Sequence, residues 1–270
     1  ELGKRLRGAG YGQAIVLPNS LKSALVPWFA NIPRRTGWRG EWRYGLLNDL
    51  RTLDADQYPQ MVQRFAALAL DAGSRLAESP PRPRLEVDDG QVARLRQALS
   101  LEEGRSTMAL CPGAEFGEAK CWPPGHYAAL AQCYLDRGWQ VLLLGSAKDR
   151  AATGAVREAL GAGSACLDLA GDTTLSEAID LLSMVDAVVT NDSGLMHIAA
   201  ALQRPLVAIY GATSPLFTPP QGDRVACRVS TIECAPCFQR TCPLGHHRCM
   251  REILPGQVIA ELDALLAGKR

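Results

Sequence analysis

Short apolar runs alternate with amphipathic stretches along much of the chain, and polar residues follow most of the apolar runs. Runs with the length and the aliphatic or β-branched content of buried strands occupy residues 107–111, 139–144, 187–190 and 206–210. Segments with helical periodicity separate them, at 124–137, after 145–149, up to 182, and after 193. This alternation predicts an α/β fold with a doubly wound parallel sheet over about residues 105–215.

The first part of the chain has a shorter version of the same pattern. Residues 14–17 predict a strand, and the Pro-Asn-Ser turn at 18–20 ends it and caps a helix over 21–29. A second amphipathic helix is expected over residues 58–73. The prolines of residues 78–84 indicate an extended segment that cannot continue that helix.

These patterns predict a division of the chain into three parts. Residues 1–85 are expected to form a Rossmann-like domain and the start of a linker. Residues 86–104 are expected to be the linker region, and residues 105–270 a second Rossmann-like domain. Because the first part is much shorter than the second, we expect it to be an incomplete Rossmann-like domain.

The composition is that of a globular protein, with 47% apolar residues among 270 and a net charge of +1. A charge so near zero gives no bulk attraction to nucleic acid or to a membrane. We therefore expect no nucleic-acid partner, and only a local patch at any membrane. The longest apolar runs are too short to span a bilayer and no signal peptide opens the sequence, so we expect a cytoplasmic location.

The segment 190–202 is the strongest candidate for a binding turn. A buried strand leads into a polar turn, and an Ala-rich helix follows. The amide N–H groups of Ser193, Gly194 and Leu195 would point outward with the positive end of the helix dipole. A pyrophosphate suits that place, and the missing side chain of Gly194 lets it approach the main chain.

Two polar side chains of this turn extend the hypothesis. A carboxylate repels phosphate, so Asp192 is expected to accept hydrogen bonds from neutral hydroxyls, such as those of a sugar beside the phosphate. His197 lies on the same face of the first helical turn as Ser193 and can donate to the same ligand. The alternative is ordinary helix capping by Asp192 and Ser193, with His197 as an interior histidine.

Two further loops, 112–120 and 145–149, are expected at the same edge of the sheet. A lone loop lysine is usually only solvated. Beside a helix N-terminus, however, the ammonium of Lys120 can bind a phosphate and offset the charge of a departing nucleoside diphosphate. Neither a dinucleotide fingerprint nor a Walker fingerprint is present. The expected donor contacts of the two loops are Gly113, Ala114, Lys120 and Ser146.

An Arg-rich loop at residues 33–45 is the candidate site for a second ligand. Arginines alternate there with aromatic residues and glycines. Guanidinium groups bind phosphates or carboxylates, and flat rings suit sugars; the alternative is that the arginine stems only cover aromatic surface. Arg34, Arg43 and Trp42 are expected to add to this surface. The expected contacts are Asn19, Ser20, Lys22, Arg35, Trp38 and Arg39.

Several motifs together resemble those of one enzyme family. They are Cys111-Pro112-Gly113-Ala114-Glu115, Lys120-Cys121-Trp122-Pro123, Thr190-Asn191-Asp192-Ser193-Gly194-Leu195-Met196-His197, Tyr210-Gly211-Ala212-Thr213-Ser214-Pro215, Leu17-Pro18-Asn19-Ser20-Leu21-Lys22-Ser23-Ala24-Leu25 and Arg35-Thr36-Gly37-Trp38-Arg39-Gly40. Over nearly its whole length the chain is similar to the ADP-heptose:lipopolysaccharide heptosyltransferases, and most to their heptosyltransferase II branch.

The resemblance implies a GT-B fold, with two Rossmann-like domains facing a cleft, the first for the acceptor and the second for ADP-heptose. It implies inverting, metal-independent transfer of L-glycero-D-manno-heptose to the heptosylated Kdo2-lipid A inner core of lipopolysaccharide. The implied location is the cytoplasmic face of the inner membrane, with peripheral membrane contact. Lys120 and Asp192 are the implied catalytic residues. The implied donor-site residues are Lys120, Asp192, Ser193, Gly194, Leu195 and His197.

One feature of the family has no counterpart in this sequence. In the family an acidic residue near the amino terminus, after a strand and a glycine-containing turn, is taken to be the general base. No segment of the chain matches that strand and turn. The base is therefore left unassigned and is expected to lie outside the given sequence.

Four cysteines of the segment 234–249 have the spacing of zinc ligands, and His246 and His247 lie between the last two of them. A structural zinc ion, reduced thiols in an ordered loop, and disulfides are the alternatives, the last disfavoured in a reducing compartment. No cofactor is expected to be required for catalysis. The possible zinc ligands are Cys234, Cys237, Cys242 and Cys249.

Two other functional classes compete with the heptosyltransferase hypothesis. A metal-dependent glycosyltransferase would need an Asp-x-Asp pair at a strand end, and Asp54-Ala55-Asp56 has that spelling but no buried strand before it. A nucleotide-binding or zinc-stabilised interaction module without transferase activity is the second alternative. Thermal stabilisation by ADP without transfer would favour such a module.

Overall fold

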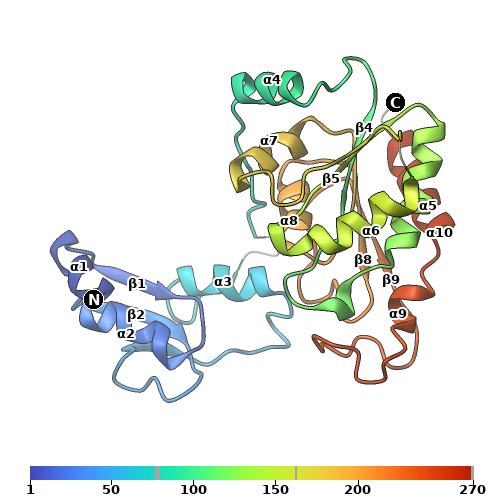
Figure 1. The fold of residues 1–270 in the computed structure, drawn as a ribbon. Coiled ribbons are helices and arrows are strands. Elements are labelled where there is room, and N and C mark those ends of the chain that lie inside the picture. Colours follow the sequence, from blue (N-terminus) through green and yellow to red (C-terminus); the bar gives the residue numbers. More distant parts are fainter. Residues whose placement is uncertain (77–79, 162, 269–270) are drawn as a thin grey trace. The chain divides into compact units, whose positions relative to one another are not determined.

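A computed structural model describes residues 1–76, 80–161 and 163–268 of the chain. Contacts within the chain divide it into two compact units (Figure 1). Unit 1 comprises Glu1–Pro81 and Leu216–Thr218, and unit 2 comprises Arg82–Pro215 and Pro219–Arg270. Within the described ranges, no helix has the length and apolar character needed to cross a membrane.

Unit 1 is built on a three-stranded sheet of order β1-β2-β3, in which both strand pairs are parallel. Its elements are α1 (Leu2–Leu6), β1 (Gln13–Val16), α2 (Leu21–Phe29), β2 (Arg34–Trp38), β3 (Asp49–Arg51) and α3 (Met61–Ala69). The predicted start of α2 is confirmed, because the hydroxyl of Ser20 accepts a hydrogen bond from the amide of Ser23.

The strand β2 lies where the sequence predicted a loop. Its second half, from Thr36 to Trp38, is buried, and the ring of Trp38 packs with Tyr58 and Leu68. Two arginines open the strand and Gly37 lies within it, so the sequence shows neither an apolar run nor an alternation of apolar and polar residues there. The expected helix over 58–73 is shorter than predicted, as α3 begins at Met61 and ends at Ala69.

Unit 2 contains a six-stranded parallel sheet of order β6-β5-β4-β7-β8-β9. The strands are β4 (Thr107–Cys111), β5 (Gln140–Leu143), β6 (Cys166–Asp168), β7 (Ala187–Asn191), β8 (Leu206–Tyr210) and β9 (Val225–Val229). The helices are α4 (Asp89–Ala98), α5 (Pro124–Asp136), α6 (Arg150–Leu160), α7 (Leu175–Met184), α8 (Gly194–Ala201), α9 (Arg248–Arg251) and α10 (Pro255–Ala267).

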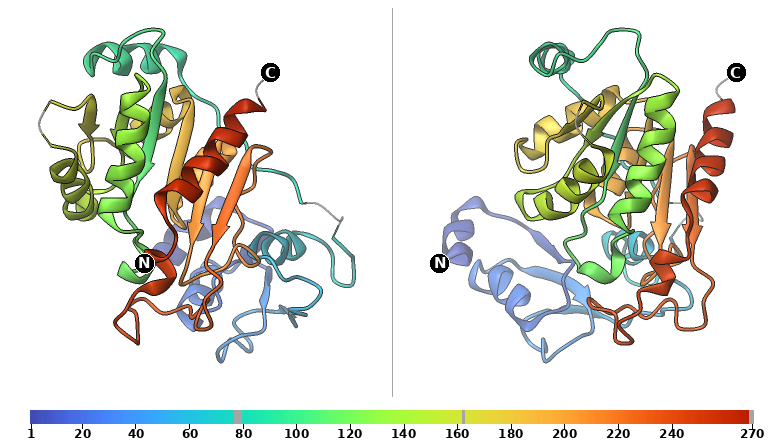
Figure 2. Two further views of the ribbon diagram at one scale, coloured as in Figure 1. Left: turned by 90° about the vertical axis from the view of Figure 1, so that its right-hand side faces the viewer. Right: turned by 45° about the vertical axis from the view of Figure 1, so that its right-hand side comes forward.

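The predicted doubly wound sheet is confirmed, and β9 extends it beyond residue 215. Figure 2 shows helices on both sides of the strands. Side chains of α5, α6 and α10 form one apolar cluster with the sheet, and side chains of α7 and α8 form the other. Because both faces are covered, the four inner strands β5, β4, β7 and β8 are almost wholly apolar and buried, whereas the edge strands β6 and β9 are only partly buried.

The strand order reverses between β4 and β7, which lie next to each other although β5 and β6 come between them in the sequence. At such a switch point the loops after the two strands diverge and leave a crevice at the carboxyl edge. These are the loops at 112–120 and at 191–194, which the sequence singled out. The fold therefore brings two predicted ligand loops side by side.

The segment 86–104, expected to be a linker, is part of unit 2. It contains α4, whose amino end is capped by Asp88 through bonds from the amides of Gly90 and Gln91. Leu95 and Leu99 of this region pack against the apolar cluster of α7 and α8. The sequence did not predict α4 as a packed helix, because most of its residues are polar and only a narrow apolar stripe faces the unit.

Candidate functional site

The carboxyl ends of β4, β5 and β7 border a cavity of about 450 Å³ within unit 2. Its wall consists of the loop after β4, the loop after β5, the segment that opens α7, and the start of α8. The lining residues are Cys111, Gly113, Ala114, Glu115, Leu144, Gly145, Ser146, Asp149, Thr173, Thr174, Leu175, Ala178, Ser193, Gly194, Leu195 and Ile198. This is the position at which open α/β sheets bind ligands.

Six predicted donor-site residues lie in this wall, namely Gly113, Ala114, Ser146, Ser193, Gly194 and Leu195. The sequence did not reveal that the segment opening α7 would join them. Thr174 was predicted only as the cap of that helix, and its hydroxyl does accept a bond from the amide of Glu177 at 3.2 Å. The signal available in the sequence was a leucine, Leu175, directly after the cap; in the structure it is 66% exposed and offers apolar contact at the ligand edge.

The amino terminus of α8 has no side-chain cap. Ser193 is the N-cap residue, but its hydroxyl lies 3.1 Å from the hydroxyl of Thr190 instead of reaching an amide of the helix. The capping alternative is therefore wrong for Ser193. Because no side chain caps α8, its first N–H groups have no side-chain partner. These groups belong to residues that line the cavity, where a bound anion would accept their hydrogen bonds.

Lys120 and Asp192 form an ion pair beside this helix terminus. The Lys120 Nζ lies 2.6 Å from Oδ2 of Asp192, and both side chains are largely buried. The hydroxyl of Thr213 donates to the same oxygen at 2.7 Å. Within the described residues, Oδ1 of Asp192 accepts no hydrogen bond and can receive a ligand hydroxyl. The predicted lysine is thus at the site, but it contacts Asp192 in this structure.

His197 lies one turn into α8, as predicted, although it is not part of the cavity wall. Burial lowers the pKa of its imidazole, Lys120 acts in the same direction, and Asp192 opposes both. The imidazole is therefore neutral at pH 7 and can donate one hydrogen bond and accept another. The alternative of a wholly interior histidine is not supported, because His197 keeps accessible surface even though the surrounding protein desolvates its imidazole.

Asn191 ties the two switch-point loops together. Its amide nitrogen donates to the carbonyl of Pro112 at 2.6 Å. Its side-chain oxygen accepts bonds from the amide of Trp122 at 3.1 Å and the hydroxyl of Tyr127 at 3.0 Å. Since Asn191 is fully buried, these bonds fix the spacing of the loops before any ligand arrives. The sequence marked this residue only as part of a polar turn.

The four cysteines of the segment 234–249 line one small pocket together with His246. All nine cysteines of the chain lie in the described ranges, and none forms a disulfide. No group of three or more His, Cys, Asp or Glu side chains in the described part of the chain is arranged to hold a metal ion. The structural zinc site therefore stays a prediction, and binding would require the thiols to move together.

Unit 1 places the predicted acceptor residues in two different environments. Trp38 is only 5% exposed, and its ring nitrogen donates to the carbonyl of Arg64, so the prediction that it offers a ring surface to a sugar is wrong. The Arg35 guanidinium donates to the carbonyls of Leu46 and Ile32, both at 2.6 Å. Main-chain bonds therefore occupy this arginine, a role that neither the predicted acceptor contact nor the alternative of covering aromatic surface described.

Arg43, predicted to add to the cationic surface, is fully buried. It donates to the carbonyl of Pro18 at 2.7 Å and to the side-chain oxygen of Asn19 at 2.9 Å, and burial lowers its pKa. Arg43 is therefore a structural cross-link, and it occupies the side chain of Asn19, another predicted contact. The sequence missed this role because nothing local distinguishes a buried arginine from an exposed one.

The remaining predicted residues of unit 1 are accessible. Lys22 and Arg39 are exposed, and Ser20 is half-buried at the start of α2. The Arg39 guanidinium lies 5.8 Å from the ring of Tyr44, and Trp42 is 84% exposed. Exposed cationic and aromatic side chains therefore do occur together on this loop, and of the two tryptophans predicted for this surface only Trp42 is exposed.

The Asp54-Ala55-Asp56 alternative is not supported by the geometry. One carboxylate oxygen of Asp54 accepts bonds from the amides of Asp56 and Gln57, both at 3.0 Å. This is an Asx turn on an exposed loop, three residues after β3 ends at Arg51, and β3 is only half-buried. The pair therefore shapes a surface turn and does not form a metal-dependent donor site.

Comparisons with known proteins agree with this site. The model of glycosyltransferase family 9 (heptosyltransferase) matches residues 1–248. Lipopolysaccharide heptosyltransferase 2 of Escherichia coli K12 is 48% identical over 98% of this chain and 78% of that protein. The corresponding protein of Salmonella typhimurium LT2 is also 48% identical, over 99% of this chain and 79% of its own length.

A solved structure extends the agreement to three dimensions. The structure of E. coli ADP-heptose LPS heptosyltransferase II superposes with a TM-score of 0.89 at 47% identity, covering 99% of this chain and 80% of that one. With a family match of this length and relatives of this identity, the chain belongs to glycosyltransferase family 9, the heptosyltransferases, and has the GT-B fold.

Proposed function

We propose that the protein transfers L-glycero-D-manno-heptose from ADP-heptose to the heptosylated Kdo2-lipid A inner core of lipopolysaccharide. The names of the relatives support heptose transfer to lipopolysaccharide. The observation that carries the proposal is the uncapped terminus of α8, which lies at a cavity and directly follows the Lys120–Asp192 pair. A nucleotide-sugar needs main-chain amides and a cation for its diphosphate, and a carboxylate that accepts hydrogen bonds from its sugar hydroxyls.

The cavity divides into parts that match the parts of the donor. Leu144, Leu175 and Ile198 give an apolar wall for the adenine, and the amides at the start of α8 receive the diphosphate. Beside the cavity wall, next to the start of α8, the free oxygen of Asp192 then accepts hydroxyl hydrogens of the heptose. Asp192 is well suited to this role, because Lys120 and Thr213 hold its other oxygen.

The chemistry follows from where negative charge develops. In an inverting displacement the acceptor hydroxyl attacks the anomeric carbon, the bond to the diphosphate breaks, and ADP carries away the electron pair. Lys120 and the α8 amides offset that charge, which is why no catalytic metal is proposed. The general base is not assigned to any described residue.

The acceptor is proposed to bind unit 1 through its exposed cations. Lys22 and Arg39 suit phosphates and carboxylates of an inner-core acceptor, and Trp42 suits a sugar ring. The same side chains, close to exposed Trp28 and Phe29 in the sequence, are of the kind that contact a lipid surface. We include peripheral contact with the cytoplasmic face of the inner membrane in the proposal.

The test is transfer by the purified protein with ADP-heptose and a heptosylated Kdo2-lipid A acceptor, followed by mass spectrometry. We expect addition of one heptose, and little transfer from ADP-glucose, whose hydroxyls are arranged differently around Asp192. Transfer to an acceptor that lacks the first heptose, but not to the heptosylated one, would contradict the assigned acceptor. Binding of ADP without transfer to either acceptor would favour the nucleotide-binding module instead.

A further inference from the structure

The segment 234–249 is docked against both loops of the Lys120–Asp192 site by main-chain hydrogen bonds. The amide of Phe238 donates to the carbonyl of Ala212 at 2.7 Å, next to Thr213. The amide of Ala119 donates to the carbonyl of Arg240 at 3.1 Å, next to Lys120. The segment therefore borders the donor site and is not a remote appendage.

Gly117 makes this docking possible. It has a φ of +153°, and a Cβ atom there would overlap the main-chain carbonyl of Arg240. The close approach involves the main chain of Arg240 and not its side chain. A substitution that changes only the Arg240 side chain therefore leaves the docking intact.

The side chain of Arg240 shares one aromatic ring with the lysine of the site. Its guanidinium carbon lies 5.1 Å from the centre of the Phe116 ring, and Lys120 Nζ lies 4.7 Å from the same centre. Each distance is that of a cation–π contact. Phe116 thus holds a second cation beside the one that contacts Asp192.

The two cations differ in how far they are neutralised. Lys120 is paired with Asp192 at 2.6 Å. The acid nearest in sequence to Phe116, Glu115, is paired with Lys148 at 2.6 Å. Within the described ranges Arg240 forms no ion pair, and its side chain is exposed. Glu115 also interacts electrostatically with Arg240 without forming an ion pair with it, so Arg240 is the least neutralised of these three cations.

We propose that Arg240 binds a phosphate of a substrate at this site, as a second cation beside Lys120. The inference rests on the proposed function, since it assigns a further residue to the same reaction. Two substrates carry phosphates, the diphosphate of the donor and the inner-core acceptor. An arginine suits either one, because its planar fork can donate two parallel hydrogen bonds while it stays stacked on Phe116.

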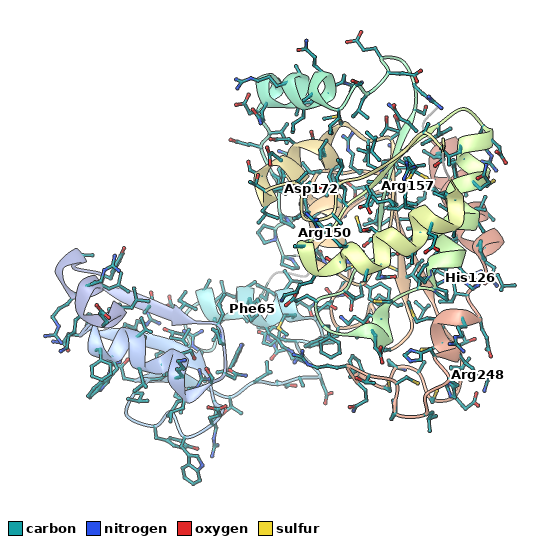
Figure 3. The ribbon with its side chains drawn as sticks, in the orientation of Figure 1. Phe65, His126, Arg150, Arg157, Asp172 and Arg248 are labelled. Atoms are coloured by element: carbon teal, nitrogen blue, oxygen red, sulfur yellow. The ribbon has the colours of Figure 1, made fainter. Side chains whose placement is uncertain are left out.

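The test compares Arg240→Ala with two matched variants of the full chain. Arg240→Lys keeps the positive charge but loses the planar guanidinium that can donate two parallel hydrogen bonds. Arg248→Ala removes another arginine of the same segment, labelled in Figure 3, whose guanidinium is already paired with Glu252 at 2.6 Å. The readouts are ADP affinity by calorimetry at two salt concentrations, and the acceptor KM at saturating donor.

Loss of a charge-assisted hydrogen bond predicts about tenfold weaker binding of the phosphate that Arg240 contacts. If that phosphate is the donor's, Arg240→Ala weakens ADP about tenfold, more at low salt, and Arg240→Lys restores part of the loss. If it is the acceptor's, ADP affinity is unchanged and the acceptor KM rises by a similar factor. Either result supports the proposal, provided that Arg248→Ala behaves as wild type.

Two results would overturn the proposal. In one, Arg240→Ala matches wild type in both readouts while wild type binds ADP and transfers heptose; the inference then fails and the proposed function stands. In the other, Arg248→Ala causes the same loss as Arg240→Ala, so the effect is a general one of surface charge. Wild type that neither binds ADP nor transfers heptose would instead refute the proposed function itself.

Discussion

Lys120 Nζ lies 2.6 Å from Oδ2 of Asp192, and together the two side chains form a largely buried ion pair at the start of α8. Removing one partner of such a pair leaves the other charge without compensation. The lysine assigned to the leaving diphosphate and the carboxylate assigned to the sugar therefore depend on each other. A variant of Asp192 should mainly change the affinity for the sugar part of the donor, whereas a variant of Lys120 should mainly change the turnover number.

Asp192→Ala should weaken ADP-heptose far more than ADP. The variant loses the hydroxyl acceptor for the sugar, whereas the α8 amides that hold the diphosphate remain, and Lys120 becomes free to contact it. Calorimetry with both ligands measures the difference. Equal losses for ADP-heptose and ADP would count against the assignment of Asp192 to the sugar.

Lys120→Ala should lower the turnover number by about 10²-fold, because it removes a cation that offsets leaving-group charge in the transition state. Lys148→Ala is the matched control, since Lys148 is an exposed loop lysine paired with Glu115 at 2.6 Å. Steady-state kinetics with both substrates saturating measures the change. An effect confined to the acceptor KM would remove Lys120 from this role.

Thr213→Val should lower turnover by about tenfold, the usual size for losing a hydrogen bond to a charged group. The hydroxyl of Thr213 fixes Oδ2 of Asp192, so its loss lets the carboxylate rotate away from the sugar. Thr213→Ser keeps the hydroxyl and should retain most of the activity. If both variants lose activity equally, Thr213 acts through packing and does not position Asp192.

Arg39→Ala and Arg35→Ala should behave differently. Arg39 is exposed, so its loss should raise the acceptor KM, most strongly at low salt, and leave ADP affinity unchanged. Arg35 donates to two main-chain carbonyls, so its loss should lower stability in urea denaturation. Unchanged acceptor kinetics for Arg39→Ala across a salt titration would move the acceptor site elsewhere.

Asp49 should make unit 1 sensitive to acid. Bonds from Arg51, and then from Thr36 and Arg34, lower the pKa of its carboxyl to about 2, and its side chain is 19% exposed. Because the folded pKa is below the unfolded value, this stabilisation is present above about pH 4 and is lost as the pH falls toward 2.

The contribution of Asp49 should be about 1–2 kcal/mol, allowing for solvent screening. Urea denaturation of Asp49→Asn and wild type, followed at several pH values, measures it. The gap between the two proteins should be present at pH 6 and shrink below pH 4. A gap that does not depend on pH would mean that the charge of Asp49 contributes nothing.

The sequence by itself determined the elements of unit 2 and the loops that carry the site. The strands β4, β7 and β8, the caps of α2 and α7, and the turn at 191–194 were all predicted correctly. These features depend on neighbouring residues, through the period of apolar positions or through a cap three residues away. The carboxyl ends of parallel strands lie at one edge of the sheet. The local strand patterns therefore also predicted that the loops 112–120, 145–149 and 191–194 lie close together.

Only the tertiary structure decided which side chains meet and which are buried. The bond between Lys120 and Asp192 joins positions 72 residues apart, and that between Asn191 and Pro112 joins positions 79 apart. Local sequence carries no record of such pairs. The burial of Trp38 and Arg43 has the same origin, since an aromatic or cationic residue on a Gly-rich loop is exposed or enclosed according to which distant segment packs over it.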